Sequence, residues 1–218
     1  MGEMRSILVV KNMLRSGSQQ KRSPIFSRSV LMFLLLGFFV LILPEVGFPM
    51  GDFIIDPEHS SIVFRVKHLG ITFVSGRFNR AMGRYVSPSG ETGKAEIDIR
   101  VRVLDINSGN AVRDEHLRSP DFFHAEKYPW ITFKSVSIEL LSAESLKVAG
   151  DLSFHGVTRR ITIEALKTGI REDGQGQIRT GFQATFSIRR SDYGMKHMLG
   201  GIGDRVELTV NVEGVRKP

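Results

Sequence analysis

The chain has 218 residues and no cysteine, which excludes a disulfide framework and any site built from thiolates. Its formal net charge of +7 is concentrated near the N-terminus, because residues 1–29 hold six of the basic residues and the chain from Gly51 onward carries a net charge of only +3. A nucleic-acid-binding protein is expected to carry its basic excess in the folded part. The composition therefore argues against nucleic acid as a partner.

Residues 1–50 have the features of an export segment. A cationic stretch precedes "VLMFLLLGFFVLIL" (30–43), which is 14 apolar residues without a charge, and Pro44 follows it. A membrane span needs about 20 residues, whereas a cationic start followed by a short apolar core is typical of a secretory signal. We expect this segment either to be cleaved or to stay as an N-terminal anchor in contact with the membrane, and residues 51–218 to form the exported domain.

From Asp52 onward the hydrophobic period is two, which is typical of strands with one apolar and one solvated face. The stretch "AEIDIRVRV" (95–103) shows the period most clearly, because its apolar residues alternate with charged ones. The same alternation predicts strands at 62–68, 130–140, 145–154, 159–165, 180–188 and 204–214. The short "HGVT" connection (155–158) indicates a hairpin.

The alternation predicts an all-β fold. Strands with one wet face each favour antiparallel pairing over a parallel sheet, and long antiparallel strands must close or pair to remove their edges. An up-and-down barrel of about eight strands is wide enough to hold one slim ligand. We expect such a barrel, with a β-sandwich as the alternative architecture.

A helical segment interrupts the strands between residues 109 and 135. Asn110 is a suitable cap for a short helix that places Arg113, His116 and Leu117 on one face. Phe122 and Phe123 follow shortly after, and an aromatic pair beside a barrel mouth would close its apolar interior. We therefore expect a short helical end-piece on the barrel.

Several motifs closely resemble those of YceI-like proteins, and together they cover almost the whole of residues 52–216. They are "DPEHSSIVFRVKHLGITFVSGRF" (56–78), "RDEHLRSPDFFHAEKYPWITFKS" (113–135), "GDLSFHGVTRRI" (150–161), "SIRRSDYGM" (187–195) and "GDRVELTVNVEG" (203–214). His124 departs from the pattern, because an acidic residue is expected after the phenylalanine pair.

The resemblance implies a lipocalin-like antiparallel barrel exported to the bacterial periplasm, possibly as a homodimer. It also implies that the barrel binds a long apolar molecule, such as a polyisoprenoid or a similar lipid, and that it has no established catalytic residues or cofactor. The expected role is transport, storage or protection.

The inward phase of the predicted strands and the aromatic pair suggest an apolar tunnel, which an isoprenoid tail could enter because each buried methylene contributes about 0.8 kcal/mol. The candidate tunnel residues are Phe64, Val66, Phe78, Ile99, Val101, Phe122, Phe123, Ile131, Phe133, Leu152, Phe154, Phe182, Phe186 and Met195. For any one of them, ordinary core packing is the simpler interpretation.

Polar residues beside an apolar tunnel could orient a ligand head group. His68 continues the inward phase of its strand, and Arg113 and His116 share a helix face, so these three are the candidates. For each, the alternative is a structural hydrogen bond.

The sequence also bears on two other functions, metal binding and catalysis. The six histidines show no H-x-H pair or helical pair, so no metal site is expected. Nucleophile, zinc-protease and phosphate-loop motifs are also missing from the sequence, so we expect a binding protein and not an enzyme. The alternatives left open are a periplasmic structural or stress protein with a self-filled barrel, and a hydrolase acting on a lipid-like substrate.

Overall fold

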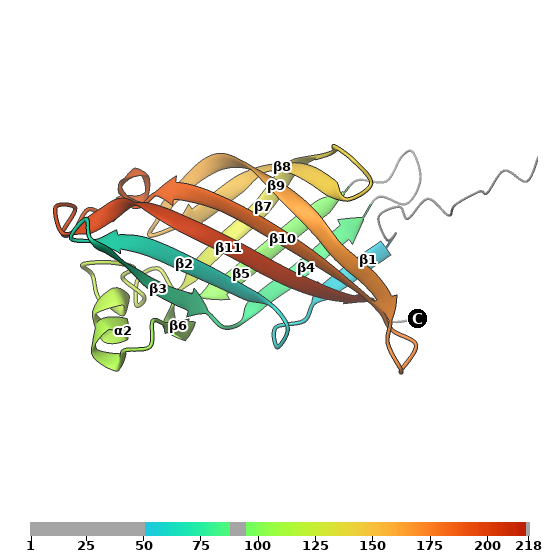
Figure 1. The fold of residues 1–218 in the computed structure, drawn as a ribbon, viewed down its shortest axis with the longest axis horizontal. Helices are drawn as coiled ribbons and strands as arrows, with labels where there is room; N and C mark the ends of the chain where they lie inside the picture. The colour runs from blue at the N-terminus through green and yellow to red at the C-terminus, as the bar shows by residue number, and fades with distance from the viewer. Residues whose placement is uncertain (1–50, 88–94, 217–218) are drawn as a thin grey trace, which may run out of the picture. The chain divides into compact units, whose positions relative to one another are not determined.

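The computed structural model describes residues 51–87 and 95–216 (Figure 1). The expected export segment, residues 1–50, lies outside the described residues. The strands are β1 (Gly51–Ile55), β2 (Ser61–His68), β3 (Thr72–Phe78), β4 (Ala81–Ser87), β5 (Glu96–Arg102), β6 (Ile106–Asn107), β7 (Trp130–Leu140), β8 (Ser145–Phe154), β9 (Val157–Glu172), β10 (Ile178–Arg189) and β11 (Ile202–Arg216). Helix α2 spans Ala111–Arg118, and 3-10 turns η1 and η2 span Val103–Asp105 and Arg190–Tyr193.

The strands pair antiparallel and close on themselves. Within the described ranges, eight strands form a ring in the order β1-β4-β5-β7-β8-β9-β10-β11, and β11 returns to pair with β1. Because the ring is closed, each of its strands has a partner on both sides. This removes the exposed edges that invite aggregation. The predicted antiparallel barrel is confirmed.

Three of the barrel strands are interrupted along their length. β11 pairs with β2 over Ile202–Asn211 and with β1 near its end, so β1 and β2 together occupy one strand position. In the same way β3 and β4 continue one another opposite β2 and β1, and β6 follows β5 after the turn η1. The predicted strand at 95–103 is therefore shorter than expected, because Val103 already belongs to η1.

Strand β7 carries a bulge that changes its inward phase. Its register with β8 shifts between Ser135 and Ser137, so Val136 falls outside the regular alternation and is 57% exposed. A bulge inserts one extra residue into a strand. Ile131 and Phe133 face the interior before the bulge. Because of the extra residue, Ile138 and Leu140 face it after the bulge.

Helix α2 lies at one end of the barrel, beside β3 and β6 (Figure 1). Its predicted cap is confirmed, since the Asn110 side chain accepts a hydrogen bond from the Arg113 amide at 2.9 Å. The following turn places Phe122 and Phe123 against the core residues of the barrel. In the part of the chain that the structure describes, no helix is long and apolar enough to cross a membrane.

Candidate functional site

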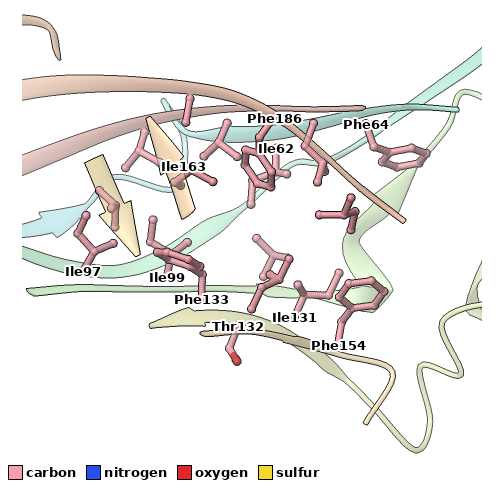
Figure 2. A pocket seen from close by; sticks show the side chains of 18 of the residues that line it. Ile62, Phe64, Ile97, Ile99, Ile131, Thr132, Phe133, Phe154, Ile163 and Phe186 are labelled. Carbon is pink, nitrogen blue, oxygen red and sulfur yellow. The ribbon is translucent and has the colours of Figure 1, made fainter. Parts of the chain in front are cut away.

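The barrel encloses a cavity of about 520 Å³. This volume falls in the range of about 300–1,000 Å³ that small-molecule pockets occupy. Figure 2 shows isoleucine and phenylalanine side chains converging on it, among them Ile99, Ile131, Phe133 and Phe186. They come from strands all around the ring, because each strand turns its apolar face inward. The interior is thus a hollow with an apolar wall.

Polar residues that contribute to this wall direct their side-chain groups elsewhere. Thr132 points away from the cavity in Figure 2. The exposed Gln183 donates a hydrogen bond to Asn211 at 2.8 Å, and the Arg100 guanidinium lies over the ring of the exposed Trp130. These three side chains therefore belong to the outer face of the barrel.

Arg190 is the charged residue of the wall that is buried, with 3% of its surface exposed. Its guanidinium donates to the carbonyl oxygens of Gly203 (3.0 Å), Met195 (3.0 Å) and Ile202 (2.9 Å). Burial lowers the pKa of this guanidinium, yet an arginine remains charged in proteins. Each of its three nitrogens thus donates to the β10–β11 connection, which gives this residue a structural role.

Tyr85 also lines the cavity, and its ring packs among phenylalanines. Its ring stacks on Phe53 at 4.9 Å and meets Phe182 edge-on at 5.3 Å. Burial raises the pKa of the phenol well above its usual value, so the group is neutral at physiological pH. The cavity consequently presents no ionised group to a ligand from this side.

Two phenylalanines of the wall place the outer end of their rings beside glycines of the neighbouring strand. Phe64 on β2 covers Gly76, its register partner on β3, and Phe133 on β7 covers Gly150 on β8. A methyl group on either glycine would overlap the ring. The ends of these rings thus occupy the space that a side chain at Gly76 or Gly150 would need.

The structure brings most of the predicted tunnel residues to the cavity wall. Those that line it are Phe64, Val66, Ile99, Val101, Phe122, Phe123, Ile131, Phe133, Leu152, Phe154, Phe182, Phe186 and Met195. Phe78 is placed differently. It is 3% exposed and packs against Phe64 and Phe123 at ring distances of 6.0 and 5.8 Å, so these two rings and not Phe78 face the hollow.

The three predicted head-group residues do not lie on the cavity wall. His68 is the last residue of β2, two positions beyond the wall residue Val66, and does not line the cavity. Arg113 is held by Ser108, whose hydroxyl and carbonyl oxygens accept from its guanidinium at 2.8 and 2.6 Å. His116 is exposed and bonds to Asp121 at 2.9 Å.

Several wall residues are not among the predicted tunnel residues. Leu146, Val148, Ile163, Val206, Leu208 and Val210 lie on the inward phase of β8, β9 and β11, to which the alternation in the sequence already assigns them. Ile138 and Leu140 are a different case. They follow the bulge in β7, and alternation counted from Ile131 assigns them to the outside.

The profile of the YceI-like domain matches residues 53–214, which is almost the whole described barrel. The chain belongs to the YceI-like family. A UPF0312 protein of Shewanella baltica is 38% identical to this YceI-like chain over 169 residues, which cover 77% of the chain and 88% of the relative. A UPF0312 protein of Shewanella sp. strain MR-7 is 37% identical over 185 residues, with coverages of 84% and 96%.

Solved structures share the barrel. The YCEI protein of Campylobacter jejuni superposes with a TM-score of 0.59 at 29% identity, covering 70% of this YceI-like chain and 90% of that one. A polyisoprenoid binding domain from Saccharophagus degradans, implicated in plant cell wall breakdown, has a TM-score of 0.56 at 16% identity, with coverages of 78% and 100%. At that identity the likeness concerns the fold alone.

Proposed function

We propose that this protein binds one long apolar chain, of the polyisoprenoid class, inside the barrel. The observation that carries the proposal is a hollow of about 520 Å³ whose wall is built from aliphatic and aromatic side chains. Removing a long hydrocarbon from water is favourable by about 0.8 kcal/mol per methylene, which offsets the cost of ordering it. The description of the Saccharophagus degradans neighbour as a polyisoprenoid binding domain supports the same ligand class.

The absence of reactive groups on the wall supports binding over hydrolysis. Among the described residues that line the cavity, none is a serine, histidine, aspartate or glutamate. A hydrolase needs a nucleophile and a base within hydrogen-bonding reach of each other and of the substrate. A barrel filled by its own side chains is also a poorer account, because the interior retains a cavity of about 520 Å³.

The proposal includes export to the periplasm. Its support is the cationic N-terminal stretch followed by the uncharged apolar run at 30–43. An exported carrier would move or store a lipid between membranes, and an uncleaved segment would keep the barrel at the membrane surface. N-terminal sequencing of the protein recovered from a periplasmic extract tests export, and the mass of the native particle tests the homodimer.

Native mass spectrometry tests the ligand. The full chain is expressed, purified and measured before and after organic extraction, and then after incubation with a polyprenyl alcohol. We expect one lipid-sized adduct per barrel, which extraction removes and the alcohol restores. A barrel that is free of ligand and takes up no polyprenyl alcohol contradicts the proposal.

Paired variants of β7 locate the binding surface. Phe133→Asp places an unpaired carboxylate on the apolar wall and should abolish the adduct. Val136→Asp, three residues along the same strand, introduces the same charge at an exposed position and should retain it. Ala184→Phe narrows the hollow without adding a charge. It tests the same binding surface if Phe133→Asp does not fold. Wild-type uptake by a folded Phe133→Asp protein would show that the ligand lies elsewhere.

A further inference from the structure

Three potential metal ligands meet at the end of the barrel that carries α2. His116 lies on α2, Asp121 lies in the turn that follows it, and His197 comes from the connection between η2 and β11. His116 Nε2 is 2.9 Å from Asp121 Oδ2, and His197 Nδ1 is 3.8 Å from Asp121 Oδ1. One ligand atom from each residue lies within 4.8 Å of the other two.

We propose that His116, Asp121 and His197 form a binding site for a divalent transition metal, with Zn²⁺ as the best match. Two imidazoles and one carboxylate are ligands that zinc accepts, and a three-residue set leaves a fourth position for water. Ligand distances of about 2.0–2.2 Å in a tetrahedral site place neighbouring ligand atoms roughly 3.3 Å apart. Because one ligand atom from each of the three residues already lies within 4.8 Å of the other two, the side chains have to shift by no more than about 1.5 Å to reach this spacing.

The packing around the cluster orients both imidazoles. The Phe122 ring meets the His116 ring at 5.0 Å and the His197 ring at 5.2 Å, and the two histidine rings are 5.6 Å apart. The other face of the cluster is open to solvent, with exposures of 48% for His116, 50% for Asp121 and 36% for His197. An ion can thus enter without unfolding the segment.

A second cluster of similar composition shows why this one is the candidate. Asp56, His59 and Glu213 also bring their ligand atoms together, but Arg179 Nη1 lies 3.0 Å from Asp56 and 2.6 Å from Glu213. A guanidinium already neutralises those carboxylates. Among the described residues, the ion-pair partners of Asp121 are the two histidines and no lysine or arginine.

Metal binding would join two segments that border the cavity. Leu117 on α2 and Phe122 in the turn after it line the hollow, and so does Met195 in the connection after η2. A bond from both segments to one ion would hold this end of the barrel closed. The site itself involves no cavity residue as a ligand, so metal binding can be tested without any lipid.

Titration of the full-chain protein, after organic extraction, with Zn²⁺ alone tests the site. Calorimetry should show one ion per barrel, and Co²⁺ in place of Zn²⁺ should give the visible absorption of a tetrahedral nitrogen and oxygen site. His197→Ala and Asp121→Asn should each weaken Zn²⁺ binding at least tenfold, since even outer contacts of metal ligands contribute 10- to 100-fold. The matched control is His59→Ala, which should bind as wild type does.

Two results would overturn the inference. One is the absence of Zn²⁺ binding to the wild-type protein at about 100 µM. The other is wild-type affinity in the double variant His116→Ala/His197→Ala, shown to be folded by its far-UV circular dichroism. Neither result bears on the lipid, because adduct formation in native mass spectra is measured without metal.

Discussion

At the scale of single residues, the hollow depends on where the aromatic rings of the wall find room. Phe64 and Phe133 are large enough to project into a narrow barrel, yet each lies over a glycine of the adjacent strand. Glycine lowers the stability of a strand because it has nothing to pack and loses much entropy on folding. At Gly76 and Gly150 the missing side chain leaves room at the wall for the ends of the two rings.

Gly76→Ala should close part of the cavity. The added methyl overlaps the Phe64 ring and forces it to rotate toward the interior. We expect the free energy of unfolding to fall by about 1–3 kcal/mol, as for other overpacked sites, and the lipid adduct to become weaker. Urea unfolding and native mass spectrometry measure the two effects.

The control is Gly169→Ala on β9, where an added methyl meets no atom within 4 Å. It should change stability by no more than about 0.5 kcal/mol and leave the adduct unchanged. Equal lipid uptake by Gly76→Ala and Gly169→Ala would show that the ring position does not limit the hollow.

At the scale of elements, the connection from β10 to β11 is built around one buried arginine. Arg190 begins η2 and reaches three carbonyl oxygens beyond that turn, which belong to Met195, Ile202 and Gly203. Ser191 adds contacts to Asp204, whose carboxylate accepts from the Ser191 amide and hydroxyl at 2.9 Å each. The loop that carries His197 is thereby anchored at both ends.

Arg190→Ala should be strongly destabilising. It removes three charge-assisted hydrogen bonds and leaves one buried and two half-buried carbonyl groups without their donor, so we expect a loss of about 3 kcal/mol or more in the free energy of unfolding. Arg190→Lys should recover only part of it, because an ammonium does not span three acceptors as a guanidinium does. Urea unfolding provides the measurement, and exposed Arg189→Ala is the neighbouring control, with a change within about 0.5 kcal/mol. A small loss in Arg190→Ala would contradict the anchoring role.

At the scale of the whole molecule, one ion-pair network ties the strands where the ring closes. Arg179 on β10 contacts Asp56 from the β1–β2 turn, Asp173 from the β9–β10 loop and Glu213 on β11. Partial burial acts to raise the pKa of Asp56, but hydrogen bonds from His59, the Glu58 amide and Arg179 outweigh it and lower the pKa to about 2. The stability that this ion-pair network gives to the closed ring is therefore lost in acid.

The sign of the pH dependence follows from this shift. The pKa of Asp56 is lower in the folded protein than its ordinary value of 3.8, so the unfolded chain takes up the proton first as the pH falls. The contribution of Asp56 is present above about pH 4 and is lost between about pH 4 and pH 2. Asp56→Asn should flatten the fall in stability over that range.

Urea midpoints collected from pH 5 to about pH 2 test this prediction. The comparison is Asp98→Asn, whose carboxylate makes no hydrogen bond or ion pair among the described residues. In that variant the urea midpoint should fall with pH as steeply as it does in the wild type. If Asp56→Asn shows the same slope as well, the closure network does not account for acid sensitivity.

The sequence by itself determined the all-β class, the antiparallel barrel and most of its wall. These features follow from local chemistry, because a period of two fixes which side of a strand is apolar, and residues such as Asn110 cap a helix through their nearest neighbours. The family motifs pointed to the same barrel.

The tertiary structure decided what depends on distant pairing. The bulge in β7 turns Ile138 inward, Phe78 packs behind two other rings, and His116 and Arg113 bond to local partners away from the cavity. It also brings His197 beside His116 and Asp121, a contact that no spacing in the sequence indicates. The physical reason is that register, ring orientation and the meeting of loops are set by closure of the barrel, which joins residues far apart in the chain.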